Sequence, residues 1–283
     1  MQKKYIDYAT DLLNNNNVIE IIKDLKKIFA ENGLYHEEGA CLEKLFHITK
    51  SPELFLEIGD IFLNKVRNRD IANAAYNKYL YHTNKDFYLK YANNLKALGF
   101  NCADTENNDE NLPDELVQKC DKFDLIVYIM IFLHKNNDIE SVLALIPVLG
   151  KLKEAVTDYN FIGDKSYLKD IENSEKHLSK ILSKTKHHND LNKFAVQLDR
   201  ENKNAYINII DDLITYKNYN EAYSYYNDIY CSVSNGVKKQ SIVDICWVLS
   251  DFYRDNYEFY DAVRLQKMAL ELDLNKSGEE CNA

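Results

Sequence analysis

Residues that could perform acid–base or metal chemistry are thinly spread along this chain of 283 residues. His36 precedes Glu37 and Glu38, but no second histidine shares its helical face, as the metalloprotease pattern requires. His187 and His188 are adjacent, so they point to different faces of any helix. Clustered glycines that could cradle a phosphate are also missing. We therefore expect no catalytic centre, no metal site and no bound cofactor.

The six cysteines are scattered and lack the short spacings of a zinc site. Cys246 lies in an apolar stretch, which predicts a buried thiol that acts as a small hydrophobic residue. The N-terminal residues contain no apolar export signal, and the longest apolar run, Leu125 to Leu133, is far shorter than the ~20 residues of a membrane span. Free thiols and the missing signal predict a cytoplasmic protein that does not enter the membrane.

The charge of the chain is negative and unevenly placed, with a formal net charge of −10. Residues 101–115 carry six acids and no base, and residues 201–283 carry 14 acids against eight bases. A nucleic-acid-binding protein would show a basic stripe, and none is present. An acidic C-terminal third would repel phosphate and anionic lipid and would attract a basic partner segment. We expect a protein or peptide partner, and neither nucleic acid nor membrane.

The elements that must position these residues are helices. Only eight glycines and three prolines occur, and apolar residues recur every three or four positions. These features predict an all-α fold of about 11–13 helices in antiparallel pairs. We divide the chain into an N-terminal helical-hairpin array over 1–100, an acidic linker or loop over 101–113, and a C-terminal helical-repeat array over 114–283. The two arrays are expected to form one continuous solenoid.

The last two hairpins carry the clearest repeat pattern. Large Leu249 and Tyr253 flank the small Ser250 in one helix, and small Ala262 and Ala269 follow in the next. Small residues let two helices approach closely, and large residues fill the grooves between them. This pattern resembles a tetratricopeptide repeat, most clearly over residues 203–275. The resemblance implies a right-handed superhelix; an irregular α-helical array without that ancestry is the alternative.

Looser versions of the pattern occur in the N-terminal part. Gly59 takes the small position of one helix, and Ala72 and Tyr76 take positions in the next. The glycine usual at the turn between paired helices is replaced by asparagine or lysine in several hairpins.

Tyrosines crowd the last two hairpins, where they could either pack between helices or form a binding surface.

The resemblance implies a function as well as a fold. A solenoid of this kind offers a concave groove, lined by first helices, to an extended peptide or a partner helix. We expect a non-catalytic protein–protein interaction scaffold. An accessory or regulatory domain of a larger enzyme system, such as a transferase, and a peptide-sensing regulator are the alternatives. The groove candidates are the residues expected to be exposed on the first helices of the last two hairpins: Asn208, Asp211, Asp212, Tyr216, Asp244, Asp251 and Arg254.

Overall fold

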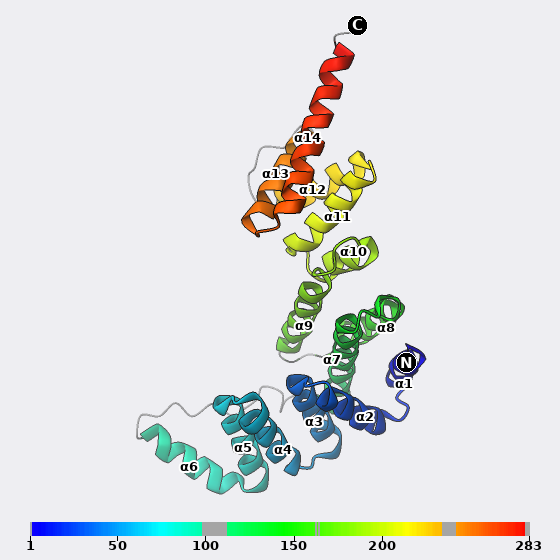
Figure 1. Ribbon diagram of the computed structural model, residues 1–283. Coiled ribbons are helices and arrows are strands. Elements are labelled where there is room, and N and C mark those ends of the chain that lie inside the picture. Colours follow the sequence, from blue (N-terminus) through cyan, green and yellow to red (C-terminus); the bar gives the residue numbers. More distant parts are fainter. Residues whose placement is uncertain (1, 98–111, 162, 164, 234–241, 281–283) are drawn as a thin grey trace. The chain divides into compact units, whose positions relative to one another are not determined.

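The computed structural model describes residues 2–97, 112–161, 163, 165–233 and 242–280 (Figure 1). These residues form fourteen α-helices and one π-helical turn, and no strand occurs among them, so the all-α prediction is confirmed. The helices slightly outnumber the 11–13 expected. The elements are α1 (Gln2–Leu13), α2 (Val18–Glu31), α3 (Tyr35–Thr49), α4 (Glu53–Ile61), η1 (Phe62–Val66), α5 (Arg69–Thr83), α6 (Lys85–Ala97), α7 (Asp114–Lys135), α8 (Ile139–Thr157), α9 (Ser166–Leu182), α10 (Asn189–Leu198), α11 (Lys203–Thr215), α12 (Tyr219–Val233), α13 (Ile242–Asp255) and α14 (Phe259–Glu280).

The helices pack into two compact units, Met1–Ser174 and Glu175–Ala283. Helix α9 contributes to both, because the boundary falls within it. The boundary therefore does not coincide with the acidic segment 101–113, of which residues 101–111 lie outside the described part of the chain. A continuous solenoid and tetratricopeptide ancestry stay predictions.

Five helix pairs are closed by the same turn. In α1–α2, α2–α3, α7–α8, α11–α12 and α13–α14, the residue after the C-cap has a left-handed backbone with φ between 58° and 69°. Its N–H donates to the carbonyl three residues back, and the next N–H donates to the carbonyl five residues back. This is the Schellman motif, which satisfies carbonyls left free at a helix end. The left-handed residues are Asn15, Gly33, Asn137, Lys217 and Tyr257.

Small residues stand where paired helices touch, as the sequence indicates. Ala222, Ser250, Ala262 and Ala269 are all buried. Gly59 on α4 faces α5 so closely that an added Cβ would lie 2.2 Å from the nearest ring carbon of Tyr76. A side chain at this position would force the Tyr76 ring to move, so glycine lets this ring pack directly against α4.

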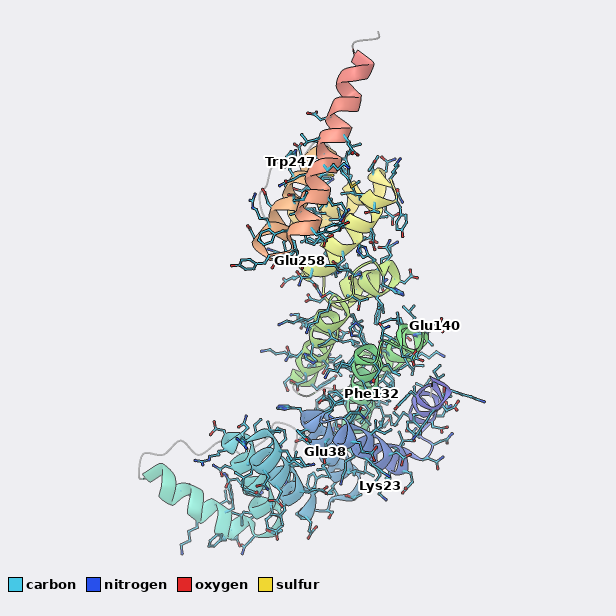
Figure 2. All side chains as sticks on the ribbon, viewed as in Figure 1. Lys23, Glu38, Phe132, Glu140, Trp247 and Glu258 are labelled. Atoms are coloured by element: carbon cyan, nitrogen blue, oxygen red, sulfur yellow. The ribbon has the colours of Figure 1, made fainter. Side chains whose placement is uncertain are left out.

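The first unit joins helices from both sides of the acidic segment. Phe132 on α7, labelled in Figure 2, packs against Tyr5 of α1 and Phe29 of α2, with ring centroids 5.6 Å and 6.1 Å apart. Helix α3 also packs against α7. The hydrophobic core of this unit is therefore built from residues far apart in the sequence.

A buried lysine crosses the same α3–α7 contact. Lys44 lies 3.2 Å from Asp121 and 2.8 Å from Asp124, and His47 lies 2.9 Å from Asp121. The Ser174 hydroxyl donates to Asp124 at 2.9 Å. Burial acts to lower the pKa of Lys44, but the carboxylates of Asp124 and Asp121 outweigh it and raise that pKa well above its usual value. The lysine therefore stays charged and holds α7 against α3.

Among the described residues, no helix is both long enough and apolar enough to span a membrane.

The left-handed turn residues give a stability test. Lys217→Gly should stabilise the protein by about 0.5–1 kcal/mol, because glycine relieves the Cβ strain of a left-handed backbone and the relief exceeds its extra entropy cost. Lys217→Ala retains a Cβ and is the matched control, with an expected change within about 0.5 kcal/mol. Urea unfolding measures both variants, and an equal effect of the two would contradict the strain assigned to this turn.

Candidate functional site

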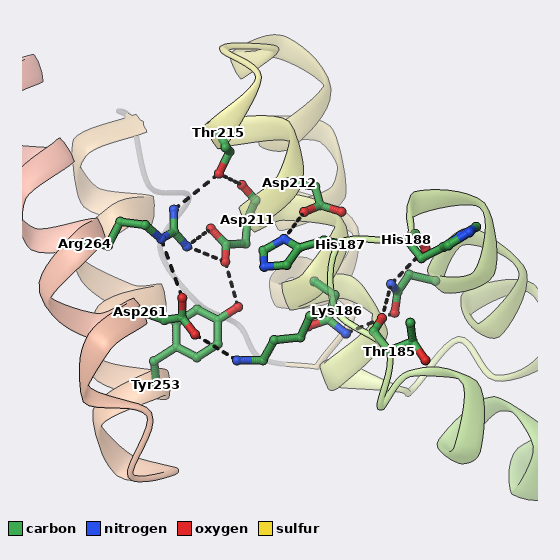
Figure 3. A network of polar contacts seen from close by, with 12 residues as sticks. Thr185, Lys186, His187, His188, Asp211, Asp212, Thr215, Tyr253, Asp261 and Arg264 are labelled. Carbon is green, nitrogen blue, oxygen red and sulfur yellow. Dashed lines mark hydrogen bonds and ion pairs between the residues drawn. The ribbon is translucent and has the colours of Figure 1, made fainter. Parts of the chain in front are cut away.

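Helix α11 places a carboxylate inside the second unit. Asn208, Asp211 and Asp212 form a polar stripe beside its apolar residues, and this stripe is enclosed as well, so that Asp211 is only 2% exposed. The Tyr253 hydroxyl of α13 donates to Asp211 at 2.9 Å, and the Arg264 guanidinium of α14 lies 2.6 Å from both carboxylate oxygens (Figure 3). Arg264 also donates to the Thr215 hydroxyl at 3.3 Å. One carboxylate thus ties together three helices.

Lys186, in the turn between α9 and α10, adds a fourth segment to this cluster. Its ammonium group lies 2.9 Å from Asp261 and also pairs with Glu258, at the start of α14. The same group lies 4.8 Å from the ring centroid of Tyr253, within range of a cation–π contact. Asp261 in turn lies 3.6 Å from Arg264, so the two cations are linked through it (Figure 3).

The pKa shifts show that this cluster holds fixed charges. Burial raises the pKa of Tyr253, and the nearby Asp211 raises it further, so the phenol stays neutral. Burial opposes the charge of Lys186, but its bonds to Glu258 and Asp261 outweigh burial and raise its pKa. Burial likewise opposes the charge of Asp261, but the bond to Lys186 outweighs it and lowers the pKa. None of these shifts brings a pKa closer to neutral pH. The cluster therefore holds charges in place, as an electrostatic clamp, rather than transferring protons.

A second set of polar contacts starts from neighbouring positions on the same polar stripe of α11. Asp212 is 3% exposed and lies 2.8 Å from Nδ1 of His187. Asn208 is 7% exposed, and its amide donates to the carbonyl of Ser183 at 2.8 Å and to the side chain of Asn192 at 3.1 Å. These bonds fasten α11 to α10 and to the turn that precedes it.

The sequence analysis therefore wrongly predicted that three of the groove residues are exposed. Asn208, Asp211 and Asp212 are buried in the second unit and do not line an open groove. These polar side chains recur at helical spacing and suggest a solvent-facing stripe, but in the folded chain the stripe packs against α10, α13, α14 and the turn before α10. The partners that make burial possible, such as Arg264, lie about 50 residues away in sequence, where periodicity gives no information.

The other predicted groove residues lie at the surface or near it. Tyr216, at the end of α11, is 78% exposed. On α13, Asp251 and Arg254 are exposed and pair with each other at 2.9 Å, and Asp244 is half-buried. Trp247, labelled in Figure 2, is 40% exposed. Its spacing of three and four residues from Asp244 and Asp251 places it on the same helical face as these acids. The sequence analysis did not select Trp247, although a lone tryptophan spaced three and four residues from acids could have identified it.

The sequence analysis also missed an apolar stripe on α14. Ala262, Leu265 and Ala269 are buried, as expected for the inner face. The opposite face carries exposed apolar side chains at helical spacing, namely Tyr260 at 84%, Val263 at 62% and Leu270 at 54%. We call these three residues the α14 stripe. A surface helix normally has a polar outer face, so apolar residues on both faces between 259 and 270 were the available signal.

Among the residues that the structure describes, no three histidine, cysteine or acidic side chains are placed to hold a metal ion. Cys246 is fully buried, which confirms the predicted packing role. Burial raises the pKa of its thiol to about 11, so the nucleophilic thiolate is scarce at neutral pH.

The clamp predicts unequal costs for two arginine substitutions. Arg264→Met should destabilise the second unit by about 3–5 kcal/mol, because it leaves the buried Asp211 without its cation. Arg254→Met removes an exposed ion pair with Asp251 and should cost less than about 1 kcal/mol. Chemical unfolding followed by circular dichroism measures both, and similar costs would contradict the role of Asp211.

The neutral phenol of Tyr253 predicts an alkaline loss of stability. Its folded pKa is raised, so the unfolded chain loses this proton first, and stability falls as pH rises above about 10. Tyr253→Phe should flatten this fall by up to about 1.4 kcal/mol per pH unit. Tyr257→Phe changes an 82% exposed ring and is the control. If both variants follow the wild-type pH profile, the hydroxyl of Tyr253 is not held as described.

No model of a known protein family matches the chain, and comparison with curated proteins gives no match. Its function is therefore inferred from its own residues.

Proposed function

We propose that this protein is a non-catalytic protein–protein interaction scaffold, and that the α13–α14 hairpin binds a partner helix or peptide. The observation that carries the proposal is the distribution of exposed large apolar side chains among the described residues. The hairpin holds the largest share of them: Trp247, Tyr257, Phe259, Tyr260, Val263 and Leu270. Exposed apolar patches rimmed by polar residues are typical of protein interaction sites.

The α14 stripe suits an amphipathic partner helix. Its side chains recur at the spacing of one helical face, and a second helix could insert its own apolar residues between them. Burial of such side chains stabilises a complex by about 25 cal/mol per Å² of apolar surface before the costs of association are subtracted. This makes the stripe the better source of affinity, since the exposed acids alone contribute little.

The acids of α13 suit the basic partner segment expected from the charge of the chain. Asp244 and Asp251 flank Trp247, and tryptophan is prominent among residues that dominate binding energy. A partner segment that carries apolar residues next to lysine or arginine could pack against α14 and lie near the acids of α13. The buried thiols of Cys41 and Cys246 agree with the reducing, cytoplasmic setting that belongs to this proposal.

Substitution of the stripe tests the function. Val263→Glu should reduce partner capture at least tenfold, because a charge would be buried in the interface, at a cost above about 1.4 kcal/mol. Val263 is 62% exposed, so the free protein should remain folded. Ser224→Glu adds the same charge at an exposed position of α12 and is the control.

The measurement is affinity capture from the native host with the full chain immobilised, followed by quantitative mass spectrometry. The proposal expects proteins retained by the wild type and by Ser224→Glu but lost with Val263→Glu. Capture of nothing above the bare matrix, or an identical set with all three proteins, would overturn it.

A further inference from the structure

The first unit contains a cavity of about 460 Å³. It lies among the α1–α2 turn, the start of α2, the end of α3 and the N-terminal half of α7. The volume falls within the range of pockets that hold small organic molecules. Its apolar wall is formed by Val18, Ile19, Ile22, Ile48 and Leu125.

Lys122 gives this cavity a buried positive charge. The residue is 7% exposed and lines the cavity, and its ammonium group donates to the neutral amide oxygen of Asn15. Among the described residues, no carboxylate lies within ion-pairing distance of this ammonium. Burial lowers the pKa of Lys122, and nearby Lys119 lowers it further, against the opposite effect of Asp121. Within the part of the chain that the structure describes, this buried cation therefore lacks a counter-ion, which carries an energetic cost.

The acids that line the cavity are already paired with other cations. Asp121 lies between Lys44 and His47, at 3.2 Å and 2.9 Å. Glu115 pairs with Lys119 at 2.9 Å, and Glu20 pairs with Lys23 at 3.0 Å. These acids therefore do not neutralise the charge of Lys122 within the described lining of the cavity.

The start of α2 offers a second set of donors to the same cavity. Val18, Ile19 and Glu20 open the helix and line the cavity, and the side chain of the N-cap, Asn17, makes no capping hydrogen bond. The first N–H groups of a helix lack internal acceptors, and the helix dipole favours an anion there. Amide donors and a buried ammonium therefore border one partly apolar cavity.

We propose that this cavity binds a small monocarboxylate with a short alkyl body. The carboxylate would accept hydrogen bonds from Lys122 and from the start of α2, and the alkyl group would pack against Ile22, Ile48 and Leu125. Glu20, Glu115 and Asp121 border the site, so a singly charged head group suits it better than a phosphate dianion.

The experiment uses the full chain and hexanoate as the probe, measured by isothermal titration calorimetry. Hexylamine, hexanol and hexyl phosphate share the alkyl body and differ in the head group. We expect hexanoate to bind more tightly than each of the three, and its affinity to fall as pH rises toward 10, as Lys122 loses its proton. Hexylamine or hexanol binding as tightly as hexanoate would overturn the proposal. Tighter binding of hexyl phosphate would overturn the assignment to a monocarboxylate.

Two variants locate the site. Lys122→Met should reduce hexanoate affinity at least tenfold, and it should fold, because it removes an uncompensated buried charge. Ile48→Phe should block the cavity and reduce affinity while leaving Lys122 in place. Lys27→Met, the control, removes an exposed lysine of α2 that pairs with Glu31 outside the cavity lining, and it should change affinity less than twofold. Unchanged affinity in Lys122→Met, or no hexanoate binding to the wild type at millimolar concentration, would show the proposal to be wrong.

Discussion

The second unit depends on one buried carboxylate. Asp211 is enclosed by its own helix and by α13 and α14, and a buried charge without a partner costs several kcal/mol. Helix α11 can therefore lie in the interior only when Tyr253 and Arg264 are both brought to it. Apolar faces tolerate small shifts in packing, whereas this carboxylate is satisfied in one arrangement of three helices.

The first unit also depends on a buried charge, but here the central buried group is a cation and its partners are carboxylates. Lys44 on α3 is the buried cation, and Asp121 and Asp124 on α7 are its partners. Packing of apolar faces by itself does not select which helices become neighbours. Buried ions make that choice, because a wrong neighbour would leave a charge unpaired. In both units the pairing joins helices that are far apart in the sequence.

This long-range pairing explains what the sequence could and could not predict. Helix positions, hairpin turns and the small residues Gly59, Ala222 and Ala262 depend on neighbours close in the chain, and their local patterns were sufficient. The burial of Asp211 depends on Arg264, 53 positions away, and no local pattern contains that information. The candidate site was therefore predicted only in part: its hairpins were identified, but acids inside the fold were taken for surface residues. The crowded tyrosines of the last two hairpins, which include Tyr260, were left open between packing and a binding surface, and Val263 and Leu270 were not selected.

The burial of acids on α11 and the exposure of apolar residues on α14 change which residues could contact a partner. Acids buried along α11 cannot attract a basic segment, so the proposed contact with such a segment depends on α13, where Asp244 and Asp251 flank Trp247. Apolar side chains left outside on α14 gain nothing for the folded chain alone and leave a hydration cost that only an association removes. The cavity beside Lys122, in the first unit, also presents an unmet interaction. Among the described residues, its ammonium group lacks a counter-ion, whereas on α14 apolar side chains lack apolar neighbours. A carboxylate that bound only the folded form at 100 times its Kd would stabilise that form by about 2.7 kcal/mol. Since the cavity walls come from α2, α3 and α7, that stabilisation would act on the packing that joins the helices before the acidic segment to those after it.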